Sequence, residues 1–150
     1  MKTKNKIPIS ENSVQKMPVS RSIDENISEE MRVLIICNEH RFGRSLLELL
    51  FITGYKSHIA LTDLEVVNLL QQYRFGLVIL DLRMIEIYGQ GMMDKIKSRQ
   101  GSTKLIMLSH DSIFDKAVWA LRQGADDFFK TPYSPDELLL SIKKQFSQKP

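Results

Sequence analysis

The chain has 150 residues, of which 43% are hydrophobic and 26% charged, proportions typical of one globular domain with a buried core. The net charge of +3 gives no reason to expect binding to nucleic acid or to a membrane. The single cysteine excludes an internal disulfide and indicates a reducing compartment, so we expect a cytoplasmic protein. No apolar stretch approaches the roughly 18 residues of a membrane-spanning helix.

Residues 1–30 differ in composition from the rest of the chain. They are rich in Ser, Asn, Lys and Glu, include two prolines and show no sustained periodicity. Such a segment buries too little apolar area to offset the entropy lost on ordering. We predict a flexible arm over 1–30 and a folded domain over 31–150.

From residue 31 onward, strand-like and helix-like segments alternate. Apolar, β-branched runs such as "RVLIIC" predict strands, and apolar residues at helical spacing predict helices. Asp63 is the expected cap of the second helix, Gly54 stops the first, and Ser134 opens a capping box with Glu137. In chain order, the predicted elements are strand 32–37, helix 41–53, strand 56–60, helix 63–73, strand 76–81, helix 89–99, strand 104–109, helix 112–124, strand 126–130 and helix 134–146.

Five strand–helix units with short loops predict an α/β fold. Right-handed crossovers place helices on both faces of a five-stranded parallel sheet, that is, a doubly wound (βα)5 fold. Ligands of such sheets bind at the carboxyl ends of the strands. Four strands end here on polar residues: Cys37-Asn38, Asp81, Ser109-His110 and Lys130-Thr131. A carboxylate, a hydroxyl and a lysine around one crevice suggest phosphate chemistry.

The chain resembles the receiver domain of bacterial two-component response regulators. "LVILDLRMIEIYG" resembles the third-strand motif, with Asp81 at the phospho-acceptor position and Gly89 at the loop glycine. "LIMLS" places Ser109 at the switch position of the fourth strand, and "GADDFFKTPY" resembles the fifth-strand signature. The resemblance implies a flavodoxin-like fold with strand order 2-1-3-4-5, a cis peptide before Pro132 and an aromatic switch at Phe128. It also implies a signalling module, not an enzyme.

Two departures from the family pattern affect the site. The family has two acids at the end of the first strand, which bind Mg²⁺ together with the acceptor; here Cys37 and Asn38 occupy those positions. The family lysine before the cis proline is replaced by Thr131, and Lys130 lies one residue earlier, pointing to the other side of the strand. A thiol is a poor ligand for Mg²⁺, and Asn38 contributes no charge. We therefore expect no cofactor, and Mg²⁺ only if phosphorylation is conventional.

Several interpretations of the individual residues remain open. Asp81 is either a slow phospho-acceptor or an inherited carboxylate paired with Lys130 or Arg83, and we favour the second. Arg83 could fold back as a built-in cation in place of the metal, or lie in solvent. Ser109 could hydrogen-bond Asp81 or only end its strand. Cys37, Asp81 and His110, with His40 nearby, could together bind Zn²⁺, but no paired ligand spacing supports this, so we treat both histidines as ordinary loop residues.

The fourth helix, fifth strand and fifth helix form the usual signalling face of the family. Val118 and Leu121 are expected to face the core, which leaves Trp119 outside as a candidate interface residue.

The preferred function is an atypical receiver that binds protein partners through this face, with Asp81 phosphorylation absent or impaired. The alternative is a conventional receiver phosphorylated on Asp81 by a sensor histidine kinase. A third hypothesis is a sensor of a small ligand or metal in the emptied crevice. Besides the kinase, we consider a second copy of the chain as a partner, and neither nucleic acid nor membrane.

Overall fold

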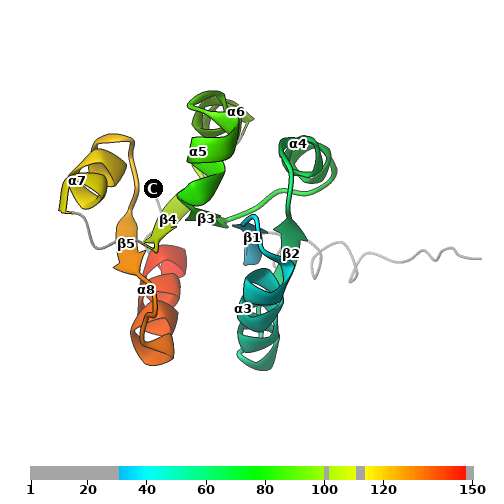
Figure 1. The fold of residues 1–150 in the computed structure, drawn as a ribbon. Coiled ribbons are helices and arrows are strands. Elements are labelled where there is room, and N and C mark those ends of the chain that lie inside the picture. The colour runs from blue at the N-terminus through cyan, green and yellow to red at the C-terminus, as the bar shows by residue number, and fades with distance from the viewer. Residues whose placement is uncertain (1–30, 100–101, 111–113, 148–150) are drawn as a thin grey trace, which may run out of the picture.

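The computed structural model describes residues 31–99, 102–110 and 114–147, so the predicted arm over 1–30 lies outside the described residues. Strands and helices alternate along this part of the chain (Figure 1). In chain order they are β1 (Arg32–Ile36), α3 (His40–Ile52), β2 (Lys56–Ala60), α4 (Asp63–Gln72), β3 (Leu77–Asp81), α5 (Arg83–Tyr88), α6 (Gly91–Arg99), β4 (Lys104–Ser109), α7 (Phe114–Arg122), β5 (Asp127–Lys130) and α8 (Pro135–Ser147).

The five strands form one parallel sheet in the order β2-β1-β3-β4-β5, which confirms the predicted flavodoxin-like, doubly wound fold. The register aligns the carboxyl ends of the strands. Ile36 pairs with both Ala60 and Leu80, and Ser109 pairs with Lys130. The residues that follow β1, β3, β4 and β5 therefore meet at one edge of the sheet.

Helices cover both faces of the sheet (Figure 1): α3 and α8 lie on one face, and α4, α5, α6 and α7 lie on the other. Alternate residues of each strand point to opposite faces, and the core accordingly divides into two clusters. Leu77 and Ile79 of β3 belong to the cluster beneath α3 and α8. Asp81 continues this alternation, so its side chain leaves β3 on the face that α3 and α8 cover.

The structure contains one short helix that the sequence analysis did not predict, and it changes one predicted helix cap. Residues predicted as loop form a short helix, α5, which ends where Gly89 adopts a φ of 83°. The cap of α4 is Thr62 rather than Asp63, because the Thr62 side chain accepts the backbone N–H of Glu65 at 3.2 Å. The Ser134 cap is confirmed, since its Oγ accepts the N–H of Glu137 at 3.4 Å. Within the described residues, no helix has the length and apolar character needed to cross a bilayer.

Candidate functional site at the carboxyl end of the sheet

Asp81 ends β3 and is only 1% exposed, which is unusual for an ionisable side chain. Its backbone position is held by β4, because the N–H of Leu82 donates to the carbonyl of Leu108 at 2.9 Å. Its carboxylate receives a backbone hydrogen bond in turn, from the N–H of Arg83 to Oδ1 at 2.9 Å. A buried carboxylate of this kind needs compensating charge or hydrogen bonds, and the neighbouring side chains supply them.

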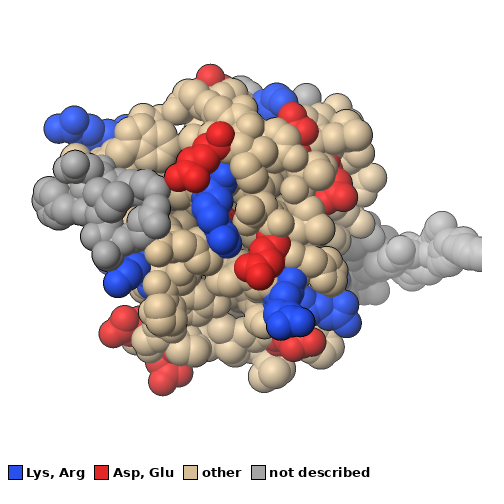
Figure 2. Space-filling view, viewed as in Figure 1, with Lys and Arg blue, Asp and Glu red and all other residues tan. Residues whose placement is uncertain are grey.

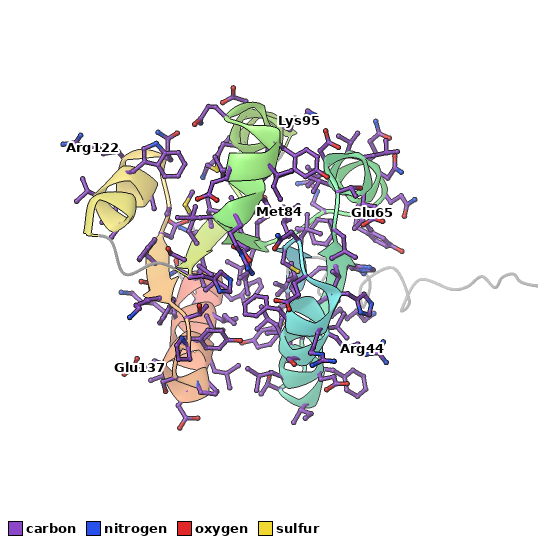
Figure 3. The ribbon with its side chains drawn as sticks, viewed as in Figure 1. Arg44, Glu65, Met84, Lys95, Arg122 and Glu137 are labelled. Atoms are coloured by element: carbon purple, nitrogen blue, oxygen red, sulfur yellow. The ribbon has the colours of Figure 1, made fainter. Side chains whose placement is uncertain are left out.

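The guanidinium of Arg83 folds back onto Asp81. Nη2 of Arg83 lies 2.8 Å from Oδ2, while Nε lies 3.2 Å from Oδ2 and 3.3 Å from Oδ1. The hydrogen bonds to Asp81 raise the pKa of Arg83 above its usual value, although partial burial opposes this. Met84, the next residue, is fully buried in the opposite core cluster (Figure 3) and anchors the start of α5. The α5 helix thus fixes the backbone from which Arg83 reaches the carboxylate.

His110, which follows β4, completes this cluster. Its Nε2 lies 2.7 Å from Nη2 of Arg83 and 3.0 Å from Oδ2 of Asp81. Its Nδ1 lies 2.9 Å from Oγ1 of Thr131, and the ring of Phe42 packs edge-on at a centroid distance of 5.4 Å. The sequence analysis placed His110 at this edge of the sheet, directly after Ser109, but treated it as an ordinary loop residue and so missed its contacts with Arg83 and Thr131.

Cys37 and Asn38, at the positions where the resemblance implied two acids, differ in their surroundings. Cys37 is fully buried, and its Sγ donates a hydrogen bond to the carbonyl of Glu39 at 3.5 Å. Burial is the main cause of a raised pKa for the Cys37 thiol, so it remains protonated and uncharged at neutral pH. Asn38 is exposed. Glu39 is also exposed, with Oε1 3.9 Å from Nη2 of Arg83, a distance typical of a weak surface ion pair.

Lys130, Thr131 and Ser109, the other residues expected at this crevice, differ in their surroundings. Lys130 is exposed at the end of β5, and within the described residues Asp81 forms its ion pair with Arg83 and also contacts His110. Thr131 contacts His110 instead, and its peptide bond to Pro132 is cis, as the resemblance implied. Ser109 is 1% exposed at the end of β4. The structure therefore places Asp81, Arg83, His110 and Thr131 together and leaves Lys130 and Asn38 outside.

The described residues contain no group of three or more His, Cys, Asp and Glu side chains arranged to hold a metal ion. Asp81 and His110 meet, but the Cys37 thiol is turned toward Glu39. A pocket of about 430 Å³ lies on the surface of α3 beside β2, and its lining does not include Asp81. Figure 2 shows basic and acidic side chains interspersed on the face it draws, with no large area of one sign.

The predicted signalling face has a different arrangement on α7 from the one expected. Leu121, predicted to face the core, is 57% exposed, while Ala120 is fully buried. Trp119 is partly buried against the core, as is Phe128 of β5. Among the described side chains of α7, β5 and α8, the large apolar ones that remain exposed are Leu121 and Leu140, the latter 68% exposed.

Comparison with known proteins gives consistent matches. A family model described as the response regulator receiver domain matches residues 33–143. The chain is 31% identical over 114 residues to alginate biosynthesis transcriptional regulatory protein AlgB of Pseudomonas putida, covering 76% of this chain and 25% of AlgB. It is 28% identical over 113 residues to regulatory protein AtoC of Escherichia coli, covering 75% of this chain and 24% of AtoC. The chain thus spans about a quarter of the length of these relatives.

Among solved structures, the response regulator receiver domain protein (CheY-like) of Methanospirillum hungatei superimposes with a TM-score of 0.69 at 26% sequence identity. The superposition covers 77% of this chain and 93% of that protein.

Proposed function

Because this chain belongs to the response regulator receiver domain family, we propose that it is an atypical receiver whose acceptor carboxylate is occupied by its own arginine. It works as a protein-interaction module in two-component signalling, with Mg²⁺-dependent phosphorylation of Asp81 absent or impaired. The observation that carries the proposal is the 2.8 Å contact between Nη2 of Arg83 and Oδ2 of Asp81.

The residues around Asp81 do not fit a Mg²⁺ ion. Mg²⁺ takes six oxygen ligands in near-octahedral geometry and is usually held by one or two carboxylates. Cys37 offers a protonated thiol turned toward the backbone, and Asn38 carries no charge. At 4 Å and an effective dielectric near 20, each missing unit charge costs a divalent ion about 8 kcal/mol of attraction before solvation is counted. A guanidinium already within 3.3 Å of both carboxylate oxygens adds repulsion to that loss.

Arg83 also affects the carboxylate as a nucleophile. Attack on a phosphoryl group requires a carboxylate oxygen with a free lone pair directed at the incoming phosphorus. Arg83 donates to both oxygens, and His110 lies against Oδ2 as well. These contacts stabilise the carboxylate in its ground state, so they raise the barrier to its reaction.

Incubation of the full chain with Mg²⁺ and acetyl phosphate, followed by intact mass spectrometry, tests this proposal. We expect at most a trace of the species heavier by about 80 Da that one phosphoryl group would add. The Asp81→Asn variant, treated in parallel, corrects for phosphorylation at other sites. Near-complete modification that disappears in Asp81→Asn would establish the alternative, a conventional phospho-acceptor. The resemblance of "LVILDLRMIEIYG" to the third-strand motif, with Asp81 at the phospho-acceptor position, favours this alternative.

The partners that we propose are proteins, bound through the surface formed by α7, β5 and α8. Exposed Leu121 and Leu140 support this surface, because large accessible apolar side chains are enriched at interfaces. A second copy of the chain and a sensor histidine kinase are the two partners to test. Sedimentation of Leu140→Asp beside wild type tests the first, with Leu64→Asp on α4, a leucine that is 65% exposed, as the matched control. Phosphotransfer from a histidine kinase to wild type but not to Asp81→Asn would identify the second as a partner, and it would at the same time establish the conventional alternative.

A further inference from the structure

We propose that the outer surface of α3 binds a second copy of this chain, with the two α3 helices antiparallel about a two-fold axis. This goes beyond the proposed function and does not depend on whether Asp81 is phosphorylated. The surface contains a groove separate from the site at the carboxyl end of the sheet, lined by His40, Arg44, Leu47, Glu48, Phe51, Ile52 and Ile59. The surface formed by α7, β5 and α8 is then left to other protein partners.

The groove has an exposed apolar lining. It lies along α3 beside β2, with a volume of about 430 Å³. Phe51 and Ile52 line it and are 78% and 79% exposed, more than any other large apolar side chain that the structure describes. Leu47 and Ile59, also in the lining, are only partly buried. An accessible apolar patch with charged residues beside it is typical of a protein interface.

The charged side chains of the groove complement each other. Arg44 and Glu48 are 64% and 65% exposed, and the contact between them, from Nε to Oε2, is long at 3.8 Å. Such a surface pair contributes little to stability, so both charges remain available to a partner. Figure 3 shows Arg44 on the side of α3 that faces away from α8. A patch with one base and one acid matches a partner that presents the same two charges in reverse order, and a second copy supplies this.

A two-fold axis at the level of Leu46 produces that match. A two-fold interface uses the same patch on both copies, so each contact occurs twice. Arg44 and Glu48 lie two residues on either side of Leu46, about 3 Å along the helix axis. In antiparallel copies, Arg44 of each is therefore level with Glu48 of the other. Phe51 of each copy is level with the part of the other groove between His40 and Arg44.

The orientation and the size of the contact follow from the same helix. A parallel pair would set Arg44 level with Arg44 and Glu48 level with Glu48, and like charges across an interface are unfavourable. The 13 residues of α3 span about 20 Å, and one helix face buries less than the roughly 800 Å² per partner of a standard interface. We therefore expect a dimer that forms at high protein concentration and dissociates on dilution.

Complementary charge reversals in the full chain, measured by sedimentation equilibrium, test the proposal. We expect wild type to dimerise as its concentration is raised toward millimolar. Arg44→Glu gives each copy two acids in the groove, and Glu48→Arg gives each copy two bases. Each variant alone should dimerise at least about tenfold more weakly than wild type. An equimolar mixture of the two variants pairs acids with bases again and should recover dimerisation.

Reversals at other exposed positions are the controls. Arg122→Glu on α7 and Glu86→Arg on α5 change the net charge in the same way. Alone or mixed, they should dimerise as wild type does. Leu140→Asp on α8 should also keep the dimer, whereas Phe51→Asp should weaken it. Circular dichroism checks that each variant is folded.

Several results would overturn the proposal. A wild-type chain that stays monomeric at these concentrations contradicts it without any variant. Reversals at Arg44 and Glu48 that leave the dimer unchanged, or that mixing does not rescue, would show that these residues do not pair across the interface. A dimer lost in Leu140→Asp but kept in Phe51→Asp would place the second copy on α8. None of these outcomes affects the phosphorylation assay, so the two proposals fail separately.

Discussion

Gly43 of α3 packs so closely on Cys37 that a Cβ added to the glycine would lie 2.8 Å from Sγ and 3.2 Å from Cγ2 of Ile59. This contact ties the first helix to the strand end where the family has an acid. The thiol therefore has a packing role against the helix, in addition to being a poor metal ligand.

Gly43→Ala should destabilise the protein by about 1–3 kcal/mol, because the new methyl group overpacks the contact with Cys37. Helix propensity alone would favour alanine by about 1 kcal/mol, so the sign of the change identifies the steric cause. Urea denaturation measures it. Gly91→Ala at the start of α6, where an added Cβ meets nothing within 4 Å, is the control and should not destabilise. The double variant Cys37→Ala/Gly43→Ala should lose less stability than the sum of its single changes.

Asp81→Asn should lower the free energy of unfolding by about 1–3 kcal/mol, because it leaves the Arg83 guanidinium without its carboxylate. If Asp81 instead lay among other acids, Asp81→Asn would raise the free energy of unfolding, since neutralising the carboxylate would relieve repulsion between like charges. Urea midpoints of the two proteins measure the difference. Glu48→Gln on α3 breaks an exposed pair with Arg44 at 3.8 Å and should change stability by no more than about 0.5 kcal/mol.

The triple variant Cys37→Asp/Asn38→Asp/Arg83→Ala should bind Mg²⁺ at least about tenfold more tightly than wild type, because it restores two charges and removes the competing guanidinium. Titration calorimetry gives the affinities. A second triple variant, with Arg44→Ala in place of Arg83→Ala, loses an arginine from a helix surface but keeps the one on Asp81. Equal binding by both triple variants would mean that Arg83 does not compete with the metal.

Stability should fall as the solution is acidified below about pH 6.5, through the titration of His58. Burial lowers the pKa of His58, and the positive charges of Arg32 and Lys56 lower it further. The unfolded chain therefore binds a proton on His58 at a higher pH than the folded chain does. The loss of stability begins near the pKa of His58 in the unfolded chain and grows as the pH falls through its pKa in the folded chain. Arg32 Nη1 lies 2.8 Å from Nε2 of His58, and protonation would also abolish this hydrogen bond.

The His58→Phe variant keeps a ring that can stack on Tyr73, as His58 does at a centroid distance of 4.5 Å, but cannot titrate. Urea midpoints at pH 7.5 and pH 5.5 should differ less for this variant than for wild type. His40→Gln, at an exposed position of α3, is the matched control and should retain the wild-type difference. If the two midpoints differ as much in His58→Phe as in wild type, a group other than His58 causes the loss of stability in acid.

The strands and helices could largely be predicted from the sequence, because the apolar pattern that indicates each one lies within that strand or helix. The apolar, β-branched runs at 32–37 and 104–109 predict buried strands without reference to the rest of the chain, and both are strands in the structure. The sequence analysis did not predict the short helix α5, since six residues are too few to show a helical period. For α7 it predicted the wrong side of the helix to face the core. In α7 the order of Trp119, Ala120 and Leu121 allowed two apolar faces, and packing against the sheet selected the one through Ala120.

The sequence by itself determined that Asp81 ends a buried strand of a parallel sheet and that Cys37 and Asn38, neither of them an acid, follow another, because strand ends can be read from patterns along the chain. Only the tertiary structure decided which side chains reach that carboxylate. Arg83 could extend into solvent or fold back, and in the structure it folds back beside His110, which follows β4 and lies 27 residues further along the chain. Contacts between side chains so far apart in sequence exist only once the sheet has brought the strand ends together.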